Sequence, residues 1–194
     1  MDGLAETIET YDRVADAYRK RHEDRDPVAD QVDRFREAVD GPVILDVGCG
    51  PGWESATFAE RGYDVLGVDV TPGLLEIAVE EAPEADFVRM DMRSFGVADG
   101  AVDGIWACAS FLHVPRSDAP DTLAEFRRVL RDGGVLWLSV KGGSGTRPGD
   151  TYEDDERQFT LYRAGELREL VSEAGLAVEA VSGGDWVQVF GTTP

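Results

Sequence analysis

The stretch VILDVGCGPGWES, residues 43–55, decides the fold of this chain. An aliphatic run that contains one acid, Asp46, is followed by glycines at every second position, Gly48, Gly50 and Gly52. Short aliphatic runs of this kind are typical of buried strands, and glycine allows the positive φ angles of a tight turn. The pattern predicts a strand whose following loop brings bare backbone close to a ligand.

Strand and helix patterns alternate on both sides of this loop. The sequence predicts strands at 43–47, 64–70, 86–90, 102–109 and 133–141, and helices at 4–21, 28–39, 53–60, 72–82, 117–130 and 163–174. Near the end, LAVEAVS and DWVQVFG flank a GG pair and predict a hairpin. Such alternation indicates a parallel sheet covered by helices on both faces. We therefore expect a Rossmann-like, doubly wound α/β/α sandwich with a seven-stranded, mostly parallel sheet and a C-terminal antiparallel hairpin.

The charge balance limits the classes of partner. The chain has 39 aspartates and glutamates against 19 lysines and arginines, a formal net charge of −20. Such a surface repels phosphate backbones, so we expect no nucleic-acid partner. An acid-rich chain whose only lysines are Lys20 and Lys141 resembles the proteins of halophilic archaea. An acidic enzyme from a host with a GC-rich genome is the alternative.

The remaining composition points to a cytoplasmic protein without metal or disulfides. No apolar run approaches the about 20 residues that span a bilayer, and the acidic N-terminus lacks the features of a signal peptide. Cys49 and Cys108 form no C-x-x-C pair. Asp118 and Asp121 fall at the start of an expected helix, whose dipole explains them better than a metal does.

Two classes of nucleotide-like ligand fit the glycine loop. A dinucleotide fingerprint needs a third glycine where this chain has Trp53. Asp69, at the end of the second expected strand, suits the ribose hydroxyls of either ligand class. The sequence motifs separate the two classes. LDVGCGPG, GVDVTPGLLEIA, FVRMDMRSF, VDGIWACASFLHVPRSD and RVLRDGGVLWLSVK resemble, in order, the motifs of class I S-adenosylmethionine-dependent methyltransferases.

The resemblance implies S-adenosylmethionine as cofactor and a role for each matching residue. Near the methionine portion it implies Asp46, Gly48, Cys49, Gly50, Ala109 and Ser110, and near the adenosine it implies Asp69, Val70, Asp91 and Met92. YDRVADAY resembles a family segment that folds over the cofactor, which makes Tyr11 and Tyr18 candidate lid residues. The resulting single domain, 1–194, divides into a helical lid (1–40), a cofactor-binding core (41–141) and an acceptor-side loop, helix and hairpin (142–194).

Structural roles compete with several of these assignments. Asp69 could cap the helix that starts at residue 72, and Asp91 could cap a turn in MDMRSF. Tyr11 and Tyr18 lie seven residues apart, so packing on the sheet explains them equally well. Cys49 could simply be a small residue in a crowded loop.

His113 is the candidate base, because it follows the fourth strand and imidazole titrates near neutrality. Hydrogen bonding within its loop is the alternative role. The chain has ACAS after the fourth strand, in place of the N-P-P-Y-like tetrad of amino-methylating enzymes that act on nucleic acid. We therefore expect methyl transfer to a small molecule. A non-catalytic S-adenosylmethionine sensor or partner subunit and a nicotinamide-dependent oxidoreductase are the alternatives, and the acceptor, the accepting atom and the oligomeric state stay open.

Overall fold

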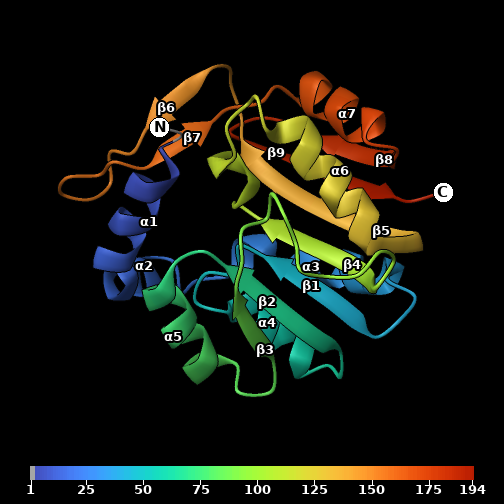
Figure 1. The fold of residues 1–194 in the computed structure, drawn as a ribbon, viewed down its shortest axis with the longest axis horizontal. Helices are drawn as coiled ribbons and strands as arrows, with labels where there is room; N and C mark the ends of the chain where they lie inside the picture. Colours follow the sequence, from blue (N-terminus) through green and yellow to red (C-terminus); the bar gives the residue numbers. More distant parts are fainter. Residues whose placement is uncertain (1–2) are drawn as a thin grey trace.

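The computed structural model describes residues 3–194, and a seven-stranded sheet forms its centre (Figure 1). The strands are β1 (Val43–Val47), β2 (Asp64–Asp69), β3 (Asp86–Arg89), β4 (Val102–Cys108), β5 (Leu130–Lys141), β8 (Ala177–Ser182) and β9 (Trp186–Thr192). Their order is β3-β2-β1-β4-β5-β9-β8. The pairings among β1 to β5 are parallel, whereas β9 runs antiparallel to β5 and β8. The predicted sheet and its terminal hairpin are therefore confirmed.

Helices cover both faces of this sheet. They are α1 (Leu4–Arg13), α2 (Ala15–Arg21), α3 (Ala29–Ala38), α4 (Trp53–Ala59), α5 (Pro72–Glu81), α6 (Ala119–Val129) and α7 (Ala164–Glu173), with short 3-10 turns at Asp26–Val28 and Phe111–His113. Residues of α3 and α4 pack with one face, and residues of α6 and α7 with the other. The described helices include none with both the length and the apolarity to cross a bilayer.

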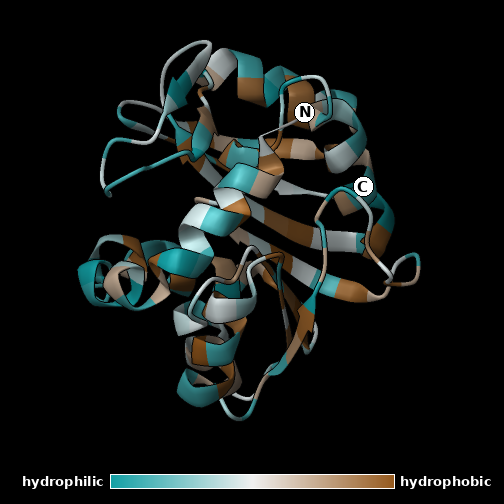
Figure 2. Ribbon diagram, turned by 60° about the vertical axis from the view of Figure 1, so that its left-hand side comes forward, coloured by the Kyte–Doolittle hydropathy of each residue, from teal (hydrophilic) through white to brown (hydrophobic). Residues whose placement is uncertain are grey.

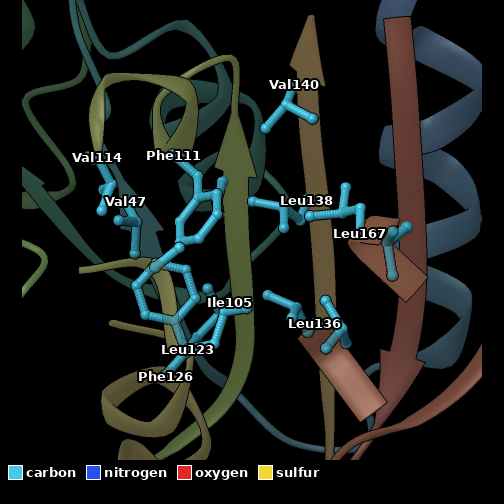
Figure 3. Packing of buried hydrophobic residues seen from close by; sticks show 14 of the residues in the cluster. Val47, Ile105, Phe111, Val114, Leu123, Phe126, Leu136, Leu138, Val140 and Leu167 are labelled. Carbon is cyan, nitrogen blue, oxygen red and sulfur yellow. The ribbon is translucent and has the colours of Figure 1, made fainter. Parts of the chain in front are cut away.

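Side-chain alternation along the strands produces these two cores. Ile44 and Trp106 point toward α3 and α4, whereas their neighbours Leu45 and Ile105 join the cluster with α6 and α7. Figure 3 shows Ile105 beside Phe111 and Phe126 in this second cluster. Figure 2 colours the chain by hydropathy: brown is frequent along the central strands, whereas the helices mix brown with teal. Because these parallel strands are packed on both faces, their carboxyl ends are held rigidly. A site at those ends is therefore held rigidly as well.

Two segments differ from the sequence prediction. The helix expected at 4–21 is broken at Val14, whose φ of −109° and ψ of 15° end α1 before α2 begins. The stretch 142–158, for which the sequence predicts neither helix nor strand, contains β6 (Thr146–Pro148), which pairs antiparallel with β7 (Gln158–Thr160). We call residues 146–160 the β-arm. It lies next to α1 (Figure 1).

Candidate functional site

A crevice opens at the carboxyl ends of β1, β2 and β4, the edge where open parallel sheets bind ligands. Of the residues predicted from the sequence, Tyr11, Tyr18, Gly48, Gly50, Asp69, Val70, Asp91, Met92, Ala109, Ser110 and His113 line it. Asp46 and Cys49 lie outside this lining. Leu4, Ile8, Leu74 and Met90 add apolar surface that sequence reasoning missed. The structure thus brings most of the predicted residues together around one crevice.

The glycine loop has the predicted positive φ angles, but Gly48 and Gly50 are required for different reasons. Gly48 has a φ of 65° and Gly50 a φ of 54°. A Cβ atom on Gly48 would lie 2.2 Å from the Cβ of Ser110, so this glycine is required by packing within the protein. A Cβ on Gly50 would come only within 4.0 Å of Tyr18 Cε1. The room for a ligand beside the loop therefore lies at Gly50.

Asp69 connects the second strand to the glycine loop. Its Oδ2 accepts a hydrogen bond from the backbone N–H of Gly50 at 3.0 Å, and its Oδ1 accepts one from Thr71 at 2.8 Å. Burial raises the pKa of Asp69, whereas these backbone hydrogen bonds lower it. The bond to Thr71 lies just before α5, so Asp69 fixes the turn that leads into this helix without bonding a helical N–H. Because each carboxylate oxygen can accept more than one hydrogen bond, Asp69 keeps capacity for two ligand hydroxyls.

Asp91 lies at the crevice and also has the structural role that competes with ligand binding. Both of its oxygens accept hydrogen bonds from the Arg93 side chain, and Oδ1 also accepts from the Arg93 backbone. Arg93 pairs in addition with Asp118 at 3.2 Å. The turn role of Asp91 is therefore present, and its contact with an adenine stays a prediction.

Asp46 lies behind the loop in a buried carboxylate cluster with Glu54 and Arg25. It is 1% exposed and accepts a hydrogen bond from Ser55 Oγ at 2.6 Å. Arg25 Nε donates to Glu54 Oε1 at 2.7 Å. Burial, together with the charge of Glu54, raises the pKa of Asp46 to about 7. Cys49 is buried nearby, and burial raises the pKa of its thiol.

The N-terminal helices bring Tyr11 and Tyr18 over the crevice, with their ring centroids 5.2 Å apart. The Tyr11 hydroxyl lies 3.0 Å from His113 Nε2, and His113 Nδ1 lies 2.9 Å from the carbonyl oxygen of Gln158. A carbonyl can only accept, so Nδ1 carries the hydrogen and Nε2 accepts from Tyr11. Burial lowers the pKa of His113 to about 4, so the ring is neutral at pH 7.

A second cavity of about 500 Å³ adjoins the crevice. It is lined by Tyr11, Tyr18, Arg21, His22, Asp24, Arg25, Pro27, Val28, Cys108, Ala109, Leu112, Trp137, Ser139, Lys141, Thr151, Arg157, Phe159, Trp186 and Gln188. Four of these, Tyr11, Tyr18, Cys108 and Ala109, also line the crevice, and we call them the shared wall. Within it, Ala109 has a φ of 52°, which is uncommon for a residue with a Cβ and turns the chain sharply after β4.

The segment RQFTLY, residues 157–162 of the predicted acceptor-side region, lies partly at the second cavity. Arg157 and Phe159 line the cavity, whereas Tyr162 is fully buried in the core. Arg157 also pairs with Asp155, with Nη2 2.6 Å from Oδ2. Sequence reasoning missed the wall that β5 and β9 contribute. The contribution of β5 could have been predicted from the sequence. Trp137, Ser139 and Lys141 occupy every second position of one strand, and their side chains therefore lie on the same face of the sheet.

Comparison with known proteins agrees with this geometry. Residues 44–134 match the methyltransferase domain family. A malonyl-[acyl-carrier protein] O-methyltransferase from Serratia marcescens is 36% identical over 126 residues, covering 63% of this chain and 48% of that protein. The chain spans about half the length of such curated relatives. The matched family and these relatives are methyltransferases by description, and the similarity covers the part of the chain that forms most of the crevice.

Solved structures share the fold over almost the whole chain. A chain of the Haloferax volcanii complex that contains the Trm112 methyltransferase activator has a TM-score of 0.79 at 20% identity and covers 97% of each chain. The 1,6-didemethyltoxoflavin-N1-methyltransferase of Burkholderia thailandensis has a TM-score of 0.77 at 21% identity, covering 98% of this chain and 89% of that one. At such identities the likeness establishes the architecture.

Proposed function

We propose that this chain is a methyltransferase that transfers the methyl group of S-adenosylmethionine to a small molecule. The crevice offers what the cofactor needs: free space at Gly50, a carboxylate at Asp69 for ribose hydroxyls, and apolar side chains at Val70 and Met92 for the adenine. The Burkholderia fold neighbour was solved with S-adenosylhomocysteine and a small-molecule ligand bound, which supports the same use of the fold here.

The shared wall is the observation that carries this proposal. It separates a crevice suited to the cofactor from a second cavity of about 500 Å³, within the usual size range of small-molecule sites. A non-catalytic sensor needs only the crevice. The presence of an adjoining cavity, reached across Cys108 and Ala109, favours an enzyme in which donor and acceptor meet at this wall.

Positioning supplies much of the rate acceleration under this proposal. The bound cofactor supplies an electrophilic methyl group, and walls that align the acceptor with it can lower the barrier by several kcal/mol. His113 lines the crevice but not the second cavity, whereas Tyr11 lines both. A proton taken from an acceptor therefore reaches His113 Nε2 through the Tyr11 hydroxyl. The neutral imidazole, with Nδ1–H held by Gln158, has a free lone pair for it, but burial lowers the pKa of His113 to about 4 and makes the ring a weak base, so positioning carries the larger share of the proposal.

Calorimetric titration with S-adenosylhomocysteine tests the cofactor site. Asp69→Ala removes the acceptor for two ribose hydroxyls and should weaken binding at least tenfold, ~1.4 kcal/mol. Asp64→Ala is the matched control, because Asp64 is an exposed carboxylate at the other end of the same strand. Unchanged affinity in Asp69→Ala would place the ribose elsewhere.

Methyl transfer itself is measured by the release of S-adenosylhomocysteine. The protein is incubated with S-adenosylmethionine and a fractionated extract of low-molecular-mass compounds. We expect release that depends on one fraction and is lost in Asp69→Ala. Tight cofactor binding without release in any fraction would instead favour a sensor.

A further inference from the structure

Positive charge gathers in the second cavity of an otherwise acidic protein. The chain carries 39 acidic against 19 basic residues, yet this cavity is lined by Arg21, Arg25, Lys141 and Arg157. Asp24 is the single carboxylate among the described residues that line it. A cavity that concentrates cations within an anionic surface attracts anionic ligands.

Two of these cations are already neutralised within the protein. Arg25 pairs with Glu54 at 2.6 Å. Arg157 binds both oxygens of Asp155, at 2.7 and 2.6 Å, and the two side chains are 5% and 1% exposed. Both arginines therefore hold the cavity walls in place, and neither has its full charge available for a ligand.

Lys141 differs from these arginines because its ammonium has no carboxylate partner among residues 3–194. Its Nζ lies 4.3 Å from the ring centroid of Phe159 and 6.0 Å from that of Trp186. Burial lowers the pKa of Lys141, and the nearby charges of Arg147 and Arg157 lower it further. The charges of Asp150 and Asp155, which pair with Arg147 and Arg157, act in the opposite direction and raise it. In a chain rich in acids, a partly buried lysine without a carboxylate leaves room for the anion of a ligand.

The strands place this lysine on a rigid aromatic wall. Trp137, Ser139 and Lys141 alternate along β5 and face the cavity together. In the antiparallel register, Lys141 pairs with Trp186, and Ser139 pairs with Gln188. Trp186 is 43% exposed, a large apolar side chain left at the surface beside the cavity. Its indole provides a flat apolar surface that suits an aromatic ligand, whereas Trp137 and Phe159 line the cavity but are only 2% and 5% exposed.

The distance along the sheet sets the size of that ligand. Cys108 of the shared wall pairs with Ser139 on β5, and Lys141 lies two residues farther along the same strand. Two residues of a strand span about 6–7 Å. This is close to the length of one aromatic ring with its substituents, so a ring at the shared wall would present its far substituent to Lys141.

We propose that the methyl acceptor is an aromatic carboxylate whose carboxylate binds Lys141. Its accepting atom then lies at the shared wall and its ring lies against the aromatic side chains of the cavity. This substrate class rests on the methyltransferase function proposed above. Lys141 acts by binding and orienting the acceptor, because it lies away from the wall where the methyl group crosses.

Matched acid and amide probes test this proposal. The protein is first saturated with S-adenosylhomocysteine and then titrated with 4-hydroxybenzoate, 6-hydroxy-2-naphthoate and their amides, with binding followed by ligand-observed NMR. Lys141→Met removes the charge at similar length, and Lys141→Arg keeps it. Lys20→Met is the control, because the chain's other lysine is exposed on α2 and lines neither cavity.

We expect at least one acid to bind tenfold or more tightly than its amide. The preference should disappear in Lys141→Met and persist in Lys141→Arg and Lys20→Met. Equal binding of acid and amide, no binding of either, or a preference that survives Lys141→Met overturns the proposal. If S-adenosylhomocysteine binds but one of these outcomes is found, only the aromatic-carboxylate proposal fails, and the methyltransferase proposal is unaffected. If it does not bind, the proposed function itself fails.

Discussion

Asp46, in the glycine-loop motif, is an ionisable side chain buried in the protein interior. Its side chain is 1% exposed, and it shares the interior with Glu54, the carboxylate with which Arg25 forms its ion pair. Burial, followed by the charge of Glu54, raises its pKa to about 7. An unfolded chain loses the same proton near pH 4. Folding therefore favours the protonated carboxyl, which the unfolded state does not retain at neutral pH.

The stability contributed by Asp46 depends on pH in a defined direction. Because its folded pKa is raised, the contribution is complete below about pH 4 and is lost as pH rises through about 7. Asp46→Asn keeps an acceptor for Ser55 and cannot ionise. It should raise the free energy of unfolding by roughly 2 kcal/mol at pH 8 and by less at pH 5.

Urea denaturation at the two pH values measures this difference. Asp64→Asn serves as the control, because Asp64 is exposed and should change stability little at either pH. An equal effect of Asp46→Asn at pH 5 and pH 8 would show that Asp46 is ionised throughout this range.

The sequence identified the crevice residues better than it identified their partners. The spacing of Asp69 after the glycines predicted its place, and the structure finds it bonded to Gly50. The contact of His113 with Tyr11 joins residues 102 positions apart. How the N-terminal helices are placed on the sheet depends on tertiary packing, so no local sequence pattern could predict this contact.

At the scale of elements, α1 links α5 to the β-arm. Asp12 accepts a hydrogen bond from the Gly73 N–H at 2.7 Å, at the start of α5. On its other side, Thr10 accepts from the Glu156 N–H at 3.3 Å, and Arg13 donates to the carbonyls of Glu153 and Asp154. Figure 1 shows α1 between these two elements. The lid therefore contacts the β-arm, which contains the buried Arg157–Asp155 pair.

Removal of Arg157 should loosen the β-arm. Arg157→Gln leaves Asp155 buried without its cation, and breaking a buried pair costs about 3–5 kcal/mol. We expect faster hydrogen exchange across residues 146–160 and in α1. Arg147→Gln is the matched control, because the Arg147–Asp150 pair on the same arm has side chains 51% and 65% exposed. Surface pairs contribute about 0–1 kcal/mol. Equal exchange in both variants would contradict this role of Arg157.

Periodic patterns predicted most elements, and the exceptions have physical causes. The break at Val14 has no glycine or proline to mark it, and apolar residues continue at helical spacing through Val14 to Tyr18. The β-arm escaped notice because β6 is exposed at every position and shows no alternation. Its pairing partner β7 follows an acidic run that is typical of loops.

At the scale of the whole molecule, charge is distributed unevenly. A formal net charge of −20 destabilises the compact state through self-repulsion, while cations concentrate around the second cavity. The composition predicted the net negative charge. It could not predict the cations around the second cavity, because that cavity forms only when the β5–β9 register sets Lys141 opposite Trp186 and the N-terminal helices close over them.

Salt should therefore stabilise the protein. Molar KCl shortens the screening length from about 10 Å at 0.1 M to about 3 Å, which weakens the self-repulsion of the carboxylates. Surface ion pairs weaken as well, but their individual contributions are small. We expect the melting temperature to rise by about 5–10 °C between 0.1 and 2 M KCl. A flat profile, or an equal rise in sucrose of matched osmolality, would contradict both this mechanism and a halophilic origin.

A crystal structure of the protein with S-adenosylhomocysteine tests the central claim most directly, namely that donor and acceptor meet at the wall shared by the two cavities. The account predicts the ribose at Asp69, the adenine between Val70 and Met92, and the sulfur facing the second cavity across Cys108 and Ala109. A ligand bound outside the crevice, or a sulfur that points away from the second cavity, would contradict it.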